Sequence, residues 1–204
     1  MTDKTKIVFA TNNAHKLDEL RAIDGDRFAV LSAAEAGFSG EIPEDSDTLR
    51  DNAIQKADFL YRRLGLTCVA DDTGLEVDAL DGKPGVYTAR YAAMRGYGAD
   101  HDSAANMHAL LDDLADVADD NRTARFRTVI ALVGDDMVRT FEGTVEGVIA
   151  REPRGTNGFG YDPVFIPEGL ATTFAQMDNT AKNAISHRGR AVRKLTEALS
   201  TDIK

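Results

Sequence analysis

The sequence predicts an α/β protein in which a mixed β-sheet carries helices on both of its faces. Short apolar runs alternate with segments of helical periodicity in the N-terminal third, as in parallel β-α units. Two long strand-like segments later flank Gly134-Asp135-Asp136, which is typical of a β-hairpin. The 204 residues, 43% of them hydrophobic, suit a single domain over residues 1–204, and we expect two lobes with a cleft between them.

Strands and helices alternate through the first part of the chain. Apolar runs predict strands at 7–10, 28–31 and 66–70, and apolar residues at helical spacing predict helices at 14–23 and 47–64. The longer helix ends where a glycine follows its last apolar residue.

The second part of the chain is richer in extended segments. Its pattern predicts a helix at 103–117, paired strands at 122–133 and 137–150, a strand at 163–166 and a final helix from about His187. The βα units followed by a hairpin indicate a mixed rather than a purely parallel sheet.

The composition is acidic and poor in aromatic residues. The chain has 24 Lys and Arg against 34 Asp and Glu, a net charge of −10, and no tryptophan. Such a chain repels duplex nucleic acid and anionic membranes and lacks an aromatic surface on which single strands could stack. We therefore expect no nucleic-acid or membrane partner, whereas a small anion such as a nucleotide needs only a local positive pocket.

Cys68 is the single cysteine, so an internal disulfide is excluded and a reducing cytoplasm fits. The apolar run 7–10 is too short for the core of a signal peptide. No stretch approaches the roughly 18 apolar residues of a membrane span. We expect a cytoplasmic protein.

Two adjacent carboxylates, Asp71 and Asp72, directly follow the apolar run 66–70 and precede Thr73-Gly74. Buried strands of an α/β sheet usually end where polar groups can meet a ligand. Paired carboxylates can hold a hard divalent cation or act as a base on water. Glu44, in a loop before a long helix, would complete a cation site begun by Asp72. The alternatives are a turn with two solvated aspartates and a solvated or capping Glu44.

Two further segments are suited to anions and flat ligands. At Thr11 to Lys16 a predicted helix begins, so its amides and partial positive charge favour a phosphate that Lys16 could reach, although a plain helix cap is the alternative. Three glycines between Gly155 and Gly160 would let the backbone approach a flat ligand on which Phe159 stacks. A long surface loop is the alternative for this second segment.

A basic cluster lies near the C-terminus. Five Lys and Arg and no Asp or Glu occur between Lys182 and Lys194. Cations near a helix N-terminus oppose the helix dipole, so an anionic ligand would compensate them, although a solvated basic helix start is the alternative. Zinc is not indicated, because four histidines without ligand spacing and one cysteine make no zinc pattern.

Five segments in this order resemble the inosine triphosphate pyrophosphatase family, also called Ham1-like, over nearly the whole chain. The segments that carry the resemblance are Phe9-Ala10-Thr11-Asn12-Asn13-Ala14-His15-Lys16, Ala70-Asp71-Asp72-Thr73-Gly74-Leu75, Pro84-Gly85-Val86-Tyr87-Thr88-Ala89-Arg90-Tyr91, Gly158-Phe159-Gly160-Tyr161-Asp162-Pro163 and Ala184-Ile185-Ser186-His187-Arg188-Gly189. The resemblance implies an elongated mixed sheet flanked by helices, an active-site cleft between two lobes and a homodimer. The implied reaction is Mg²⁺-dependent hydrolysis of ITP, dITP or XTP to the monophosphate and pyrophosphate, which cleanses the nucleotide pool of non-standard purines.

The resemblance also implies roles for single residues. Glu44 and Asp72 would bind magnesium, Asp72 would be the base that activates water, and Asp71 would support the metal. The residues implied to hold the triphosphate are Thr11, Asn12, Asn13, Ala14, His15 and Lys16, and Thr73 would also contact the substrate. The base would be enclosed by Phe159, Gly160, Tyr161 and Asp162, and the pocket would be completed by Lys182, His187 and Arg188.

The chain departs from many family members at three positions. Asn12 and His15 stand where glycine is common, which affects the expected geometry of the phosphate loop, and Thr73 stands where serine is common but keeps the hydroxyl. Two rival interpretations remain open. A Maf-like house-cleaning pyrophosphatase would act on modified pyrimidine triphosphates, and a nucleotide sensor would bind ITP without hydrolysing it.

Overall fold

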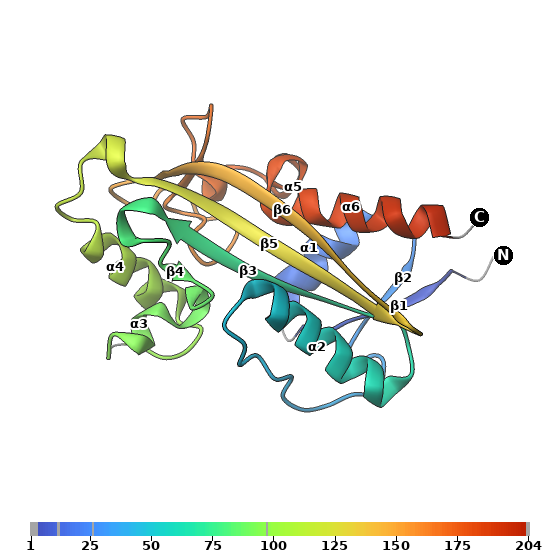
Figure 1. The fold of residues 1–204 in the computed structure, drawn as a ribbon. Helices are drawn as coiled ribbons and strands as arrows, with labels where there is room; N and C mark the ends of the chain where they lie inside the picture. The colour runs from blue at the N-terminus through green and yellow to red at the C-terminus, as the bar shows by residue number, and fades with distance from the viewer. Residues whose placement is uncertain (1–3, 12, 26, 97, 203–204) are drawn as a thin grey trace. The chain divides into compact units, whose positions relative to one another are not determined.

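The computed structural model describes residues 4–11, 13–25, 27–96 and 98–202 (Figure 1). The strands are β1 (Lys6–Phe9), β2 (Ala29–Ser32), β3 (Cys68–Val77), β4 (Pro84–Gly85), β5 (Thr123–Gly134), β6 (Met137–Ile149) and β7 (Phe165–Pro167). The α-helices are α1 (Ala14–Asp24), α2 (Leu49–Leu64), α3 (Tyr91–Met94), α4 (Ser103–Asp113), α5 (Asn179–Ile185) and α6 (His187–Asp202). Short 3-10 helices are η1 (Asp78–Leu80), η2 (Thr88–Arg90), η3 (Asp119–Asn121) and η4 (Phe174–Gln176). The predicted mixed α/β fold is confirmed.

The described strands form one seven-stranded sheet with the order β2-β1-β3-β5-β6-β7, and β4 pairs with β3 off this path. β1 runs parallel to β2, where Ile7 pairs with Val30, and parallel to β3, where Val8 pairs with Cys68. β6 runs antiparallel to β7, where Val148 pairs with Ile166. The sheet is therefore mixed, and the hairpin of β5 and β6 expected from the sequence is confirmed.

One predicted boundary is wrong in a way that matters for the site. The strand expected at 66–70 continues as β3 through Asp71 and Asp72 to Val77, so the two carboxylates lie inside a strand rather than in a turn after it. The extension is stabilised by pairing with β4, where Leu75 lies opposite Gly85, and by the burial of Leu75 and Val77. A strand in the middle of a sheet can therefore continue past charged residues if they find partners.

Two other boundaries differ from the prediction. The helix expected at 103–117 ends at Asp113 as α4, and a short helix, α5, lies ahead of α6 where none was expected. α5 has only seven residues, and its N-cap is Asp178, whose side chain accepts a hydrogen bond from the amide of Ala181. A helix this short carries too few apolar repeats to give a periodic signal.

The chain divides into two compact units. The first contains the residues up to Asp72, Thr128–Gly143 and the chain from His187 onward. Its core is formed by apolar residues of β1, β3 and β5 together with those of α1 and α6, and Leu20, Val69 and Leu195 are examples. α1 and α6 also pack against each other. The predicted burial of Leu195 on the final helix is confirmed.

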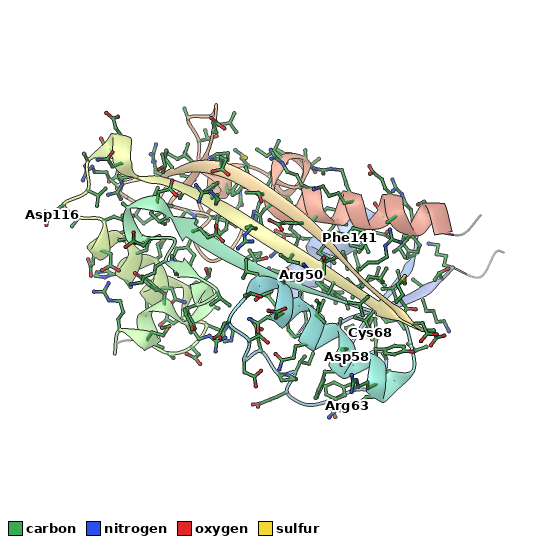
Figure 2. All side chains as sticks on the ribbon, viewed as in Figure 1. Arg50, Asp58, Arg63, Cys68, Asp116 and Phe141 are labelled. Carbon is green, nitrogen blue, oxygen red and sulfur yellow. The ribbon has the colours of Figure 1, made fainter. Side chains whose placement is uncertain are left out.

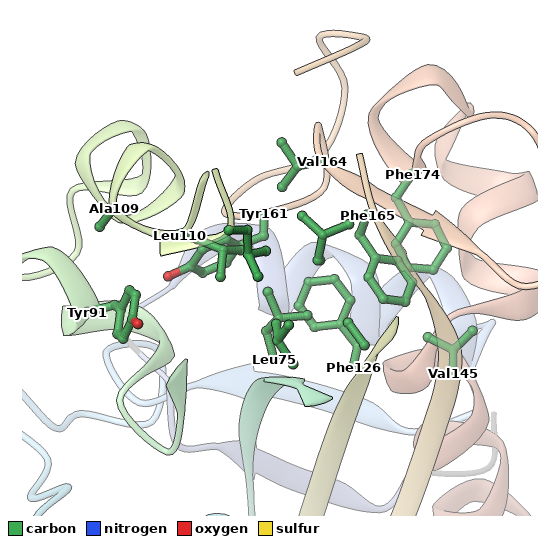
Figure 3. Packing of buried hydrophobic residues seen from close by; sticks show 14 of the residues in the cluster. Leu75, Tyr91, Ala109, Leu110, Phe126, Val145, Tyr161, Val164, Phe165 and Phe174 are labelled. Atoms are coloured by element: carbon green, nitrogen blue, oxygen red, sulfur yellow. The ribbon is translucent and has the colours of Figure 1, made fainter. Parts of the chain in front are cut away.

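The second unit contains Thr73–Arg127 and Thr144–Ser186. Its core is aromatic, and Figure 3 shows the rings of Phe126, Phe165 and Phe174 packed together. The ring centroids of Phe165 and Phe174 are 5.3 Å apart, and those of Phe126 and Phe165 are 4.7 Å apart. Such ring pairs stabilise a core beyond the area that they bury.

Cys68, labelled in Figure 2, lies at the start of β3 and is fully buried. Burial raises the pKa of its thiol to about 12, so the side chain is a small apolar group of the core rather than a nucleophile. Among the described residues, no helix combines the length and the apolar character that crossing a bilayer requires.

Candidate active site

β3 directs its two aspartates to opposite faces of the sheet. Successive side chains of a strand alternate between the two faces. Asp72 contacts Asn52 and Lys56 of α2, whereas Asp71 contacts Lys16 of α1 and Arg188 of α6. α2 therefore covers one face of β3 within the first unit, and α1 with α6 covers the other, as can be followed in Figure 1.

On the α2 face, two carboxylates share one ammonium group. Lys56 Nζ lies 3.0 Å from Glu44 Oε2 and 3.7 Å from Asp72 Oδ1. Asn52 Nδ2 donates to the other oxygen of Asp72 at 3.0 Å. Asn52 and Lys56 are one helical turn apart, so they lie on the same side of α2. The Asp72 side chain is 5% exposed and that of Glu44 is 35% exposed, so the cluster is reached from solvent on the Glu44 side.

The pKa values of the two carboxylates are shifted in opposite directions. Burial, reinforced by the neighbouring Glu44, raises the pKa of Asp72 to about 6, although Lys56 acts in the opposite direction. Burial also acts on Glu44, but Lys56 outweighs it and lowers the pKa of Glu44. Asp72 is therefore the member of the pair that takes up a proton first, as a general base working near neutral pH requires.

The same pair suits a magnesium ion. Among the described residues, no group of three or more His, Cys, Asp or Glu side chains is arranged to hold a metal ion. Mg²⁺ does not need such a group, since it keeps several waters and is usually held by one or two carboxylates together with substrate phosphates. Glu44 and Asp72 already converge on a single cationic group, Lys56, so the donor set fits a hard cation.

On the opposite face of β3, Asp71 lies between two cations. Its Oδ1 is 3.0 Å from Lys16 Nζ, and its Oδ2 is 3.1 Å from Arg188 Nε. Glu19 of α1 pairs with Nη1 of the same Arg188. Burial alone would raise the pKa of Asp71, but Lys16 and Arg188 hold it well below its usual value. Asp71 is consequently a permanent anion.

This network explains the basic cluster near the C-terminus, at least for Arg188. We expected an anionic ligand to compensate cations at the start of the final helix. In the structure the guanidinium of Arg188 is 2% exposed and is compensated by the protein's own carboxylates, Asp71 and Glu19. His187, the first residue of α6, is also buried.

The loop ahead of α1 is a helix cap built by its own side chains. Asn13 is the N-cap, and its Oδ1 accepts from the amides of His15 at 3.0 Å and Lys16 at 3.4 Å. Thr11 Oγ1 accepts from the amide of Asn13 at 3.1 Å, while Ala14 and His15 are exposed. Because the cap uses two amides of the first turn, Lys16 is the main group that this turn offers to a phosphate. Asn12 lies outside the described residues.

The glycine-rich segment belongs to the second unit and surrounds a buried ion pair. Lys182 Nζ lies 2.8 Å from Asp162 Oδ2, and the same oxygen accepts from the amide of Phe159 at 2.8 Å. Lys182 Nζ also lies 4.9 Å from the centroid of the half-buried Phe159 ring, within the range of a cation–π interaction. A Cβ on Gly158 would meet Asp162 Oδ2 at 2.0 Å, so the backbone needs glycine there.

The remaining predicted residues of this unit are also placed. The hydroxyl of Tyr161 donates to the carbonyl of Thr88 at 3.0 Å, which joins the glycine-rich loop to the segment around η2. Gly160 has the positive φ of 63° that favours glycine. Thr73 is half-buried on β3, directly after Asp72.

Sequence reasoning missed three residues that hold the predicted ones. Lys56 and Asn52 support Asp72, and Glu19 pairs with Arg188. A signal for the first two was present, since polar residues one turn apart interrupt the apolar positions of α2 next to Ala53 and Ala57. Glu19 gave no signal, because a carboxylate on an amphipathic helix is ordinarily solvated.

Comparisons with known proteins bear on this geometry. The chain matches the model of the Ham1 family over residues 7–198. The dITP/XTP pyrophosphatase of Porphyromonas gingivalis is 51% identical over 194 residues, which cover 95% of this chain and 97% of that protein. The dITP/XTP pyrophosphatase of Bacillus subtilis is 43% identical, with 94% and 96% covered.

Solved structures agree with the sequence comparisons. The Ham1 protein of Staphylococcus aureus has a TM-score of 0.85 and 39% identity, and the match covers 97% of this chain and 100% of that one. A nucleoside-triphosphatase, also described as a dITP/XTP pyrophosphatase, from Mycobacterium abscessus has a TM-score of 0.75 and 41% identity, with 94% and 98% covered. Since the family model, the sequence relatives and the solved structures all match nearly the whole chain, this chain belongs to the Ham1 family.

Proposed function

We propose that this chain hydrolyses ITP, dITP and XTP to the nucleoside monophosphate and pyrophosphate, and so removes non-standard purines from the nucleotide pool. The observation that carries the proposal is the pair of the buried Asp72 and the half-buried Glu44, which share Lys56 in a chain of the Ham1 family. The relatives from P. gingivalis and B. subtilis are both named dITP/XTP pyrophosphatases.

We propose Mg²⁺ as the cofactor, held by Glu44 and Asp72. When bound, magnesium would offset the negative charge of the phosphate oxygens. The donor set supports this assignment, because two carboxylate side chains lie within reach of one shared cation, Lys56. Lys16 supplies a further positive charge on the other face of β3 and is the side chain assigned to the triphosphate.

Asp72 is assigned as the general base. Its carboxylate takes a proton from the attacking water, a bond forms between the water oxygen and the α-phosphorus, and the bond from that phosphorus to the bridging oxygen breaks. Pyrophosphate leaves with the bonding electron pair. A base whose pKa is raised toward neutral by burial suits this step, because it accepts a proton more readily than an ordinary aspartate would.

The remaining groups are assigned to the substrate by resemblance. Thr11 to Lys16 would contact the triphosphate. Phe159 to Asp162 would enclose the base, Thr73 would contact the substrate, and Lys182, His187 and Arg188 would complete the pocket. The Lys182–Asp162 pair supports this part, because it fixes the amide of Phe159 and places a cation by its ring.

Selectivity for these purines has a hydrogen-bond explanation. Hypoxanthine and xanthine carry an acceptor at C6, whereas adenine carries an amino donor. We assign the reading of this position to Arg188, which can only donate, and His187, which can donate. A buried mismatch of two donors costs ~1–3 kcal/mol, and a cost near the upper end of this range gives roughly a 10²-fold preference.

Two finer assignments complete the proposal. The family resemblance favours a homodimer, which light scattering of the purified chain would test. Action on the free nucleotide pool and a single buried cysteine favour the cytoplasm. The proposal includes no nucleic-acid or membrane partner, in keeping with the net charge of −10.

A substrate panel tests the reaction. ITP, XTP, dUTP and dTTP are incubated with the chain and Mg²⁺, with and without EDTA, and pyrophosphate release is measured. We expect release from the two purine nucleotides only, and none with EDTA. Release from the pyrimidine nucleotides alone would instead favour the Maf-like function. The relatives are named dITP/XTP pyrophosphatases, which favours the purine substrates. Binding of ITP without any release would identify a sensor.

A further inference from the structure

Of the two adjacent aspartates, Asp71 is the one to which the family resemblance gave no part beyond supporting the metal. We propose that Asp71 is a positioning residue: it holds Lys16 and Arg188 in place for the substrate and is not a ligand of the divalent ion. This inference rests on the proposed function, because it assigns Asp71 a part in the same hydrolysis. It replaces the expectation that Asp71 supports the metal.

The first support is the contact pattern of the carboxylate. Each oxygen of Asp71 has its own cation, Lys16 Nζ at 3.0 Å from Oδ1 and Arg188 Nε at 3.1 Å from Oδ2. The side chain is 1% exposed. Both oxygens are therefore already engaged, so coordination of a metal ion by Asp71 would require one of these two ion pairs to break.

The second support is direction. Asp71 and Asp72 are neighbours inside β3, so their side chains point to opposite faces of the sheet. Asp72 points toward α2, and with it toward Lys56 and Glu44. An ion held by Glu44 and Asp72 would therefore be bound from the α2 face, whereas the ion pairs of Asp71 lie on the face covered by α1 and α6.

The third support is that Lys16 can leave its position more easily than Arg188 can. Arg188 is 2% exposed and has a second carboxylate, Glu19, so it keeps an anionic partner if Asp71 is neutralised. Lys16 is 17% exposed and sits on a flexible aliphatic stem, so it can turn toward solvent. Loss of the Asp71 charge should therefore act mainly by displacing Lys16.

A double-mutant cycle tests this route. We expect Asp71→Asn to lower kcat/KM for ITP by about 10²-fold, the size of effect that misplacing a substrate-binding group produces. In a Lys16→Met background, the same Asp71 substitution should cost less than about 3-fold, because the group through which it acts is already gone. Fully multiplicative losses in the double variant would overturn the proposal.

Metal binding gives a readout that activity does not. Mn²⁺ is titrated by electron paramagnetic resonance against the wild type, Asp71→Asn and Glu44→Gln, each with an inosine triphosphate whose α,β-bridging oxygen is replaced by methylene. We expect the Mn²⁺ affinity of Asp71→Asn to stay within about 3-fold of wild type, while Glu44→Gln weakens it at least ~10-fold. Equal weakening in both variants would make Asp71 a ligand and refute the inference.

A crystal structure of the wild type with Mn²⁺ and the same analogue needs no variant to fold. Asp71 should remain on Lys16 and Arg188, and an Asp71 oxygen within about 2.5 Å of the ion would refute the inference.

Asp113→Asn is the matched control, because Asp113 of α4 also accepts from an arginine, Arg95, and has no place in the proposed site. Its kcat/KM should stay within about 3-fold of wild type. If the wild type released no pyrophosphate from any nucleotide, the proposed function itself would fail, whereas the kinetic outcomes above presuppose an active wild type.

Discussion

Replacement of Asp72 by asparagine separates the proposed chemistry from the fold. Asparagine has nearly the same shape, and its carbonyl oxygen can still accept from Asn52 Nδ2, which donates to Asp72 at 3.0 Å. The variant loses only the negative charge and the ability to take up a proton. We therefore expect Asp72→Asn to fold and to lose turnover.

The magnitude follows from the role assigned to Asp72. A positioned general base contributes ~10²–10⁴-fold, and loss of a magnesium ligand adds to that, so kcat for ITP should fall at least ~10²-fold. A purely structural role predicts something else, namely a parallel loss of activity and of melting temperature.

Asp72→Asn should lower turnover but raise the free energy of unfolding at high pH. Burial raises the pKa of Asp72 to about 6 from the usual 3.8, so the folded state holds a proton more tightly than the unfolded chain does. The stability that comes with this proton is fully present below pH 3.8 and is lost as the pH rises through 6. A shift of about two pKa units corresponds to at most ~3 kcal/mol. Since asparagine stays neutral, Asp72→Asn should unfold with a higher free energy than wild type at pH 8 in EDTA, and this advantage should disappear below pH 4.

Two measurements test this prediction. Pyrophosphate release from ITP gives the activity, and chemical denaturation at pH 4 and at pH 8, with EDTA present, gives the free energy of unfolding. Wild-type protein at each pH is the reference. Turnover of Asp72→Asn within threefold of wild type would exclude Asp72 as the base. A variant that is destabilised equally at both pH values would contradict the buried, proton-retaining carboxylate that the structure describes.

Three further substitutions probe separate parts of the molecule. Arg188→Ala should reduce the ratio of kcat/KM for ITP over ATP by roughly 10²-fold, and an unchanged ratio would place base recognition elsewhere. Gly158→Ala should raise KM for ITP, because its Cβ would lie 2.0 Å from Asp162 Oδ2. The control is Gly169→Ala, since Gly169 has a similar positive φ but no atom within 4 Å of an added Cβ. An equal effect of both substitutions would mean that backbone strain alone is responsible. Arg122→Met should lower the free energy of unfolding by ~3 kcal/mol. The buried guanidinium donates to the carbonyls of Ile149, Leu114 and Ala150 at 2.8, 2.6 and 3.0 Å, and the substitution removes these three hydrogen bonds. A decrease below ~1 kcal/mol in urea denaturation would contradict this prediction.

The local elements were within reach of the sequence because their signals are local. Apolar periodicity placed α1 and α2 within two residues of their observed ends, and the turn at Asp135-Asp136 identified the hairpin of β5 and β6. The short helix α5 was beyond reach, because seven residues hold too few repeats to be distinguished from a loop.

The sequence identified candidate residues of the site, and the structure showed which side chains they contact. The sequence by itself predicted chemical roles for Asp71 and Asp72, which follow an apolar run, and for Lys16, which lies in the first turn of a predicted helix. It did not show which side chains each aspartate contacts. That was decided by β3 running on to Val77, since alternation along a strand sends Asp72 to Lys56 and Glu44 and sends Asp71 to Lys16 and Arg188. These partners lie up to 117 positions away from Asp71 along the chain, and only the packing of α1, α2 and α6 on the sheet brings them together.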